Sequence, residues 1–178
     1  DRLLAPGGVA IVDPAMADNG KLYSGFDEDY VRSIGSLAGK ADIILPNVTE
    51  AAILSGLPYQ ENIDRNYVNQ LLNGLNHPCA VLTGVDFDED STGIVLQEGT
   101  VQHEYRHKRI GTGCHGTGDI FAAVFTGALM QGKNRLDAAK IAADFTCRCI
   151  ENTVNAPAHW YGVKFEPLLP ELMEMLGR

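Results

Sequence analysis

A glycine-rich stretch over residues 111–119 carries the residue types that bind phosphate. It reads Gly111-Thr-Gly-Cys-His-Gly-Thr-Gly-Asp119 and leads directly into an apolar, alanine-rich segment. Glycine lets a backbone approach a ligand closely, and the free N–H groups and dipole at a helix N-terminus bind anions. Asp119 would repel a phosphate, so its position favours a general base that takes a proton from an attacking hydroxyl. The stretch therefore indicates phosphoryl transfer.

Oxygen-bearing side chains follow two short apolar runs that are typical of buried strands. Asp13 and Asp18 follow the first run, and Asn47 and Glu50 follow the second. Ligands of open α/β sheets bind beyond the carboxyl ends of the strands, and Mg²⁺ prefers oxygen ligands, often carboxylates through water. These residues form a candidate magnesium site. A turn aspartate and a Glu50 that only favours a helix N-terminus explain the same pattern.

Alternating strand and helix patterns must position these side chains. The expected strands cover residues 8–12, 41–45, 79–83 (closed by Gly84), 92–97 and 101–108, the last two as a hairpin. The expected helices cover residues 27–38, a segment ending at Ser55 with Thr49 as its N-cap, 64–75, 120–130, 135–151 and 167–176. The pattern predicts an α/β fold with a mainly parallel sheet, in a single domain over residues 1–178.

Composition restricts the classes of function. The chain has 178 residues, a net charge of −9 and no basic run, which argues against nucleic acid or an anionic membrane as a partner. It shows neither a membrane-length apolar run nor a signal peptide, and its four cysteines lack a framework spacing, so we expect a cytoplasmic protein with reduced thiols. Its opening, Asp1-Arg-Leu-Leu-Ala, resembles the end of a helix, so we expect the N-terminal part of a longer protein to be missing.

The spacing of Gly111, Gly113 and Gly116 also matches the dinucleotide-binding fingerprint. That fingerprint needs a buried strand directly before it and a helix that opens inside it. Here the preceding strand, residues 101–108, alternates like a half-exposed one, and the helix is expected to begin only after Asp119. The pattern therefore disfavours a nicotinamide or flavin enzyme.

Three motifs together resemble those of the ribokinase-like kinases, and the similarity runs along essentially the whole chain. Gly116-Thr-Gly-Asp119 before an alanine-rich helix resembles the superfamily signature, and Asn47-Val-Thr-Glu50 resembles its magnesium motif. Asp13-Pro-Ala-Met-Ala-Asp18 is similar to the corresponding segment of the vitamin B6 kinases, and hydroxymethylpyrimidine kinases share similar segments. The chain departs from the B6 kinase pattern at Ala15, Ala17 and Leu45, where Val, Gly and often Thr are usual.

The resemblance implies a ribokinase-like three-layer α/β/α sandwich without its N-terminal part. The implied reaction is ATP-dependent phosphorylation of the hydroxymethyl group of pyridoxal, pyridoxamine or pyridoxine, to the 5′-phosphate, in vitamin B6 salvage. One alternative is a hydroxymethylpyrimidine (phosphate) kinase of thiamine biosynthesis. Another, from a different class, is a catalytically incomplete nucleotide-binding fragment.

The resemblance also assigns roles to individual residues. Asp119 would be the catalytic base, and the N–H groups of Gly116, Thr117 and Gly118 would form the anion hole. The residues that would contact ATP are Asn47, Thr83 and Gly84, and those that would hold Mg²⁺, through water, are Glu50, Asp13 and Asp18. The adenine would rest on apolar residues between the hairpin and the following helix. A monovalent cation such as K⁺ and a homodimer are further expectations.

Overall fold

The computed structural model describes residues 4–111, 114–156, 159 and 161–178. Two compact units divide the chain: the first comprises residues up to Asp88 together with Gly93–Glu104, and the second comprises Glu89–Thr92 and Tyr105–Arg178. The expectation of one domain over the whole chain stays a prediction.

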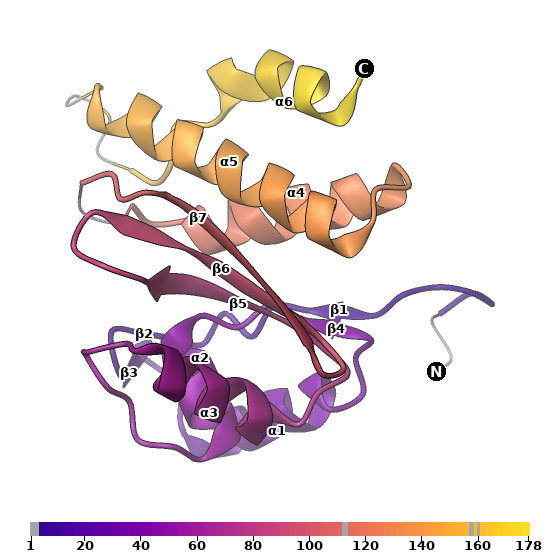
Figure 1. The fold of residues 1–178 in the computed structure, drawn as a ribbon, viewed down its shortest axis with the longest axis vertical. Helices are drawn as coiled ribbons and strands as arrows, with labels where there is room; N and C mark the ends of the chain where they lie inside the picture. Colours follow the sequence, from indigo (N-terminus) through magenta and orange to yellow (C-terminus); the bar gives the residue numbers. More distant parts are fainter. Residues whose placement is uncertain (1–3, 112–113, 157–158, 160) are drawn as a thin grey trace. The chain divides into compact units, whose positions relative to one another are not determined.

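A five-stranded sheet contains the two short strands that precede the candidate residues Asp13 and Asn47 (Figure 1). Its strands, in spatial order, are β1 (Ile11–Val12), β4 (Ile43–Ile44), β5 (Cys79–Asp86), β6 (Ser91–Glu98) and β7 (Val101–Lys108). β4 pairs in parallel with both β1 and β5. β6 and β7 are joined by residues 99–100 only, so they form the antiparallel hairpin that the alternating sequence predicted. The predicted α/β class is confirmed.

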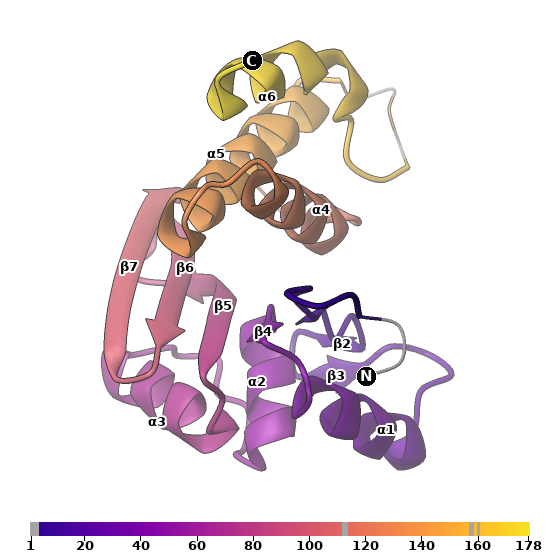
Figure 2. The ribbon, with the colours of Figure 1, turned by 90° about the vertical axis from the view of Figure 1, so that its right-hand side faces the viewer.

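Helices α1 (Glu28–Ala38), α2 (Val48–Ser55) and α3 (Arg65–Leu75) lie together beside the parallel strands of the first unit (Figures 1 and 2). Their buried faces share one hydrophobic core with β4 and β5, in which Leu71, Leu72 and Leu82 are fully buried. Asp27 caps α1 as predicted, and Asp64 caps α3. The prediction of Thr49 as a cap was wrong: Asn47 caps α2, and Thr49 lies inside the helix.

A two-residue turn shapes residues 13–22, which the sequence predicted only as a turn-rich segment. The short strands β2 (Ala17–Asp18) and β3 (Lys21–Leu22) pair across it. Asn19 and Gly20 have φ values of 50° and 75°, the positive values that a tight hairpin turn requires. A Cβ at Gly20 would lie 2.7 Å from the Tyr59 ring, so this turn also needs glycine for space.

Helices dominate the second unit. α4 (Thr117–Met130) and α5 (Arg135–Val154) are joined by residues 131–134 and pack against each other, and η1 (Glu166–Leu168) leads into α6 (Leu169–Leu176) (Figure 2). The Tyr105 hydroxyl of β7 donates to Asp144 of α5 at 2.7 Å. This hydrogen bond links α5 to the part of β7 that belongs to the second unit. Within the described part of the chain, none of the helices has the length and apolar character to cross a bilayer.

Two predicted boundaries near the candidate residues were wrong. α4 begins at Thr117, three residues before the predicted start at Ile120, because Gly116 in a left-handed conformation serves as its N-cap. β5 does not end at Thr83 but continues to Asp86 through Gly84, which has a φ of 66°. A positive φ inside a strand is accessible to glycine with little strain, so Gly84 distorts the strand without ending it.

Candidate functional site

The N-terminus of α4 is open and lacks a side-chain cap. Gly116 holds the N-cap position with a φ of 88°, and no side-chain hydrogen bond is made from it. The first helical bond runs from the Ile120 N–H to the Gly116 carbonyl, at 3.1 Å. No heavy atom of the described residues lies within 4 Å of the place where a Cβ on Gly118 would stand. The amides of this first turn are therefore not occupied by a side-chain cap, and the role of Gly116, Thr117 and Gly118 as an anion hole stays a prediction.

Asp119 lies in the first turn of α4 and is exposed. Its Oδ2 atom is 3.9 Å from the position that a Cβ on Gly116 would take, so the carboxylate reaches back towards the N-cap. A carboxylate at this place can accept a proton from a hydroxyl that approaches an anion held by the helix N-terminus. This position suits a carboxylate that acts as a general base rather than a group that binds the anion.

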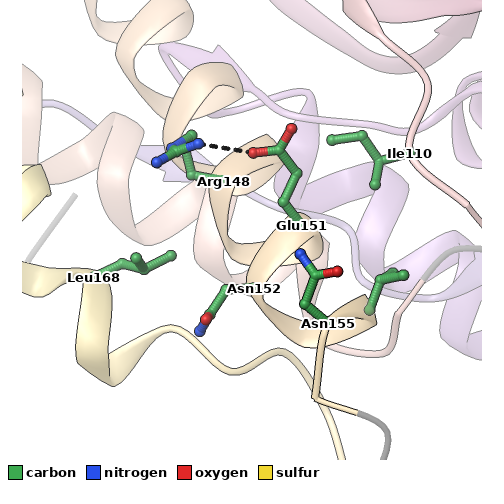
Figure 3. A pocket seen from close by; sticks show the side chains of 7 residues that line it. Ile110, Arg148, Glu151, Asn152, Asn155 and Leu168 are labelled. Atoms are coloured by element: carbon green, nitrogen blue, oxygen red, sulfur yellow. Dashed lines mark hydrogen bonds and ion pairs between the residues drawn. The ribbon is translucent and has the colours of Figure 1, made fainter.

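A pocket of about 470 Å³ lies in the same unit as this helix terminus (Figure 3). Seven residues line it: Ile110, Arg148, Glu151, Asn152, Val154, Asn155 and Leu168. The first glycine of the glycine stretch is close to one lining residue, because a Cβ on Gly111 would lie 3.5 Å from Val154. The lining of the pocket combines three apolar side chains with two amides, one guanidinium and one carboxylate, and such a mixture can offer both apolar contact and hydrogen bonds to a heterocycle.

Ion pairs order the polar side of this pocket. Arg148 pairs with Glu151 at 2.9 Å, drawn in Figure 3, and with Glu171 of α6 at 3.2 Å. Asn152 donates to the Lys164 carbonyl at 2.8 Å. The sequence predicted only unnamed apolar residues between the hairpin and the following helix. The lining residues come from separate segments, and no local pattern marks them.

The second group of candidate residues lies in the first unit, around the first turn of α2. The Asn47 side chain accepts from the Glu50 N–H, and the Glu50 carboxylate accepts from the Asn47 N–H, both at 2.9 Å. This reciprocal pair is a capping box. The interpretation of Glu50 as a helix-terminus residue is thus confirmed in its geometry, and its metal role stays a prediction.

Burial makes the Glu50 carboxylate unusual. Glu50 is only 2% exposed to solvent. The pKa of Glu50 is raised to about 7, mainly by burial and in part by the negative charge of Asp13, while hydrogen bonds from the backbone N–H groups of Asn47 and Met16 oppose the rise. Asp13 and Glu50 therefore lie close enough to interact, and a cation between them would offset two negative charges.

Magnesium fits this group only with water and phosphate completing its coordination. Across the residues that the structure describes, no cluster of three or more His, Cys, Asp or Glu side chains could hold a metal ion unaided. Protein Mg²⁺ sites commonly use one or two carboxylates together with waters and substrate phosphates. The Asp13–Glu50 pair matches that donor set. The Asp18 carboxylate accepts from the Asn19 N–H at 2.8 Å and from the Asn19 amide at 3.0 Å, and its metal role stays a prediction.

Thr83 and Gly84 lie within β5, where Thr83 is next to Asn47 at the start of α2. The Thr83 N–H donates to the Pro46 carbonyl at 2.9 Å, and Thr83 forms a parallel bridge with Asn47. Gly84 is exposed, and a Cβ there would meet no atom within 4 Å. The structure therefore brings Asn47 and Thr83 together, and it leaves the Gly84 backbone accessible to a ligand.

The dinucleotide fingerprint finds no support in the described part of the glycine stretch. α4 opens after Gly116, the last glycine of that motif, and not inside it. The preceding strand β7 is half-exposed along its length. Gly113, the middle glycine of the motif, lies outside the described residues.

Comparison with known proteins places these features in a family. Residues 4–163 match the phosphomethylpyrimidine kinase family. The hydroxymethylpyrimidine/phosphomethylpyrimidine kinase of Bacillus subtilis is 30% identical over 146 residues, which make up 81% of this chain. This chain spans only 54% of the length of that relative.

Solved structures agree with the sequence comparison. A pyridoxal kinase from Lactobacillus plantarum is 32% identical, with a TM-score of 0.80 over 93% of this chain and 61% of that one. A proposed phosphomethylpyrimidine kinase from Bacteroides thetaiotaomicron, crystallised with pyridoxal, is 28% identical, with a TM-score of 0.81 over 99% of this chain and 63% of that one. These similarities confirm the ribokinase-like fold that the motifs predicted.

Proposed function

This chain belongs to the phosphomethylpyrimidine kinase family, and from that premise we propose that it transfers a phosphoryl group from ATP to a ring-bound hydroxymethyl group. The observation that carries the proposal is the N-terminus of α4. Its amides are left without a side-chain cap by Gly116, and the Asp119 carboxylate reaches back over it. Because the chain spans little more than half of its curated relatives, the activity of the whole protein is part of the proposal.

The residues of α4 divide the chemistry between them. The N–H groups of Gly116, Thr117 and Gly118, with the helix dipole, stabilise the charge that develops on the transferred phosphoryl group. Asp119 takes the proton of the acceptor hydroxyl as the new O–P bond forms to the γ-phosphorus of ATP and the γ-phosphorus–oxygen bond to the leaving ADP breaks. The base of the nucleotide would lie in the pocket lined by Ile110 and Val154, where these apolar side chains could contact a purine and the amides of Asn152 and Asn155 could hydrogen-bond to it.

The residues of the first unit hold the metal and flank the nucleotide. Glu50 and Asn47, with Asp13 or Asp18, would hold Mg²⁺ through water, and the ion would supply positive charge to offset the negative charge of the phosphate oxygens. Thr83 and Gly84, within β5, offer backbone groups to the nucleotide. A monovalent cation, a homodimer and a cytoplasmic location remain predictions from the resemblance.

Two acceptors are candidates. The name of the Bacillus subtilis relative favours hydroxymethylpyrimidine or its phosphate. The Lactobacillus plantarum pyridoxal kinase and the Asp13–Asp18 segment favour a B6 vitamer. A panel of hydroxymethylpyrimidine, pyridoxal, pyridoxine and pyridoxamine, ranked by kcat/KM, decides between them.

Substituting Asp119→Asn tests the reaction class. We expect turnover to fall by ~10²–10⁴-fold, the usual contribution of a general base, while calorimetry still detects ATP–Mg²⁺ binding. Asp137→Asn is the matched control, because Asp137 is an exposed carboxylate in the first turn of α5, and it should leave turnover unchanged. Near-normal turnover of the Asp119 variant would overturn the assignment. If the unmodified chain binds nucleotide but phosphorylates no acceptor, the result would favour the alternative of a catalytically incomplete nucleotide-binding fragment.

A further inference from the structure

The first turn of α2 holds a second segment of the chain as well as capping its own helix. Glu50 Oε1 accepts from the Met16 N–H at 2.8 Å and from the Ala17 N–H at 3.4 Å. The Asn47 amide donates to the Ala17 carbonyl at 2.8 Å, and the Thr49 hydroxyl accepts from the Gly20 N–H at 3.0 Å. Three side chains of one turn thus bind the backbone of residues 16–20.

This segment cannot satisfy its backbone in another way. Met16 and Ala17 are fully buried, so water cannot replace the carboxylate that accepts from their N–H groups. Ala15 and Asn19, on either side, have positive φ values of 44° and 50°. Side-chain-bearing residues adopt such values at a cost and keep them where surrounding contacts enforce them.

The far end of the segment is fixed from two sides. The Gly20 amide is bound by Thr49, and the Tyr59 ring lies so close that a Cβ on Gly20 would be 2.7 Å from it. Thr49 is itself only 3% exposed. A displacement of residue 20 would therefore break a buried hydrogen bond and lose an aromatic contact together.

We propose that Thr49 and Glu50 are positioning residues, which lock residues 16–20 onto α2 and thereby fix the neighbouring Asp13 carboxylate for the metal–nucleotide complex. The metal part of this inference rests on the proposed function. Thr49 was assigned no role at the site, and Glu50 acts here through the backbone that it binds. The negative charge of Asp13 acts on Glu50. Movement of residues 16–20 would therefore change where the Asp13 charge lies relative to a bound cation.

Thr49→Val tests the inference, because valine keeps the shape of threonine and removes the accepting oxygen. We expect the Gly20 amide to exchange with solvent about two- to tenfold faster, the range for one lost hydrogen bond. The Mg²⁺ concentration needed for half-maximal ATP binding in calorimetry should rise as well. Thr49→Ser keeps the hydroxyl and should restore both values, which a purely steric role of the side chain would not produce.

Thr153→Val is the matched control. The Thr153 hydroxyl, also buried, accepts from the Lys164 N–H at 2.8 Å in the second unit. This variant should speed exchange at Lys164 and leave Gly20 exchange and the Mg²⁺ midpoint unchanged. Unchanged Gly20 exchange in Thr49→Val would overturn the lock. Faster exchange with an unchanged Mg²⁺ midpoint would overturn the positioning role. If the unmodified chain binds no ATP–Mg²⁺, the proposed function fails, and Gly20 exchange still decides whether the lock exists.

Discussion

Glu50 combines burial, three backbone donors and a neighbouring carboxylate at one side chain. Its pKa is raised from 4.5 to about 7 in the folded chain. The unfolded chain therefore loses this proton first as pH rises, and the free energy of unfolding decreases between about pH 4.5 and 7. The full effect is at most about 3 kcal/mol. Below this pH window Glu50 is protonated in both the folded and the unfolded chain, so it does not change the free energy of unfolding. Above the window its destabilising contribution is constant.

Urea unfolding at several pH values checks this sign. Glu50→Gln cannot ionise, so its stability relative to the unmodified chain should improve as pH rises from 4.5 to 7. Glu174→Gln, on the exposed side of α6, should follow the unmodified chain throughout. A constant difference between Glu50→Gln and the unmodified chain across this window would mean that Glu50 is ionised in the folded state.

Gly116 and Gly118 lie two residues apart, and alanine should act on them in opposite directions. Gly116 has a φ of 88°, so Gly116→Ala should destabilise the chain by ~1–2 kcal/mol through backbone strain. Gly118 lies inside α4 with open space around it. Gly118→Ala should therefore stabilise the helix by ~1 kcal/mol, and its methyl group should still weaken ATP binding. Thermal unfolding and calorimetry measure the two effects separately, and parallel effects on stability would contradict the assigned conformations.

Helix caps show how local sequence determines these elements. Asp64 accepts from the Tyr67 N–H at 2.7 Å at the start of α3. Asp64→Ala should lower the free energy of unfolding by ~1 kcal/mol, whereas Asp64→Asn should cost little, because asparagine caps equally well. Urea unfolding of the two variants distinguishes capping from charge, since equal losses would indicate that the charge, and not the cap, matters.

The elements that the sequence predicted well are those whose signals are local. Asp27 and Asp64 cap the helices that were expected to start at residues 27 and 64, and Gly56, in a left-handed conformation, follows the helix that was expected to end at Ser55. The start of α2 was misplaced because Thr49 and Asn47 both have cap-forming side chains, and only the reciprocal bond with Glu50 selects Asn47. The Asn19–Gly20 turn had a sequence signal for a hairpin, but its strands are two residues long.

At the scale of the whole molecule, the sequence predicted the residue types of the site better than their contacts. The α4 terminus was found because glycine spacing and a single carboxylate are visible in the sequence. The binding of residues 16–20 by α2 joins positions about thirty residues apart, and the pocket draws on three separate segments. Such contacts depend on tertiary packing, which no local periodicity encodes.

Whether the chain unfolds as one domain can be decided by core substitutions in each unit. β6 and β7 contribute residues to both units, so unfolding of either unit would remove part of both strands. On this basis we expect one cooperative transition. Leu72→Ala in α3 and Phe145→Ala in α5 remove fully buried side chains and should each cost ~2–5 kcal/mol.

Amide exchange under native conditions reads out both units at once. If the chain is one cooperative domain, each substitution should lower the exchange free energy of the best-protected amides in both units by the same amount. Leu37→Ala, at a side chain that is 54% exposed, should change neither set. If Leu72→Ala weakens protection only in the first unit and Phe145→Ala only in the second, the units fold independently. Helix α4, which we propose binds the phosphates, would then be separable from the part of the chain that carries Asp13 and Glu50.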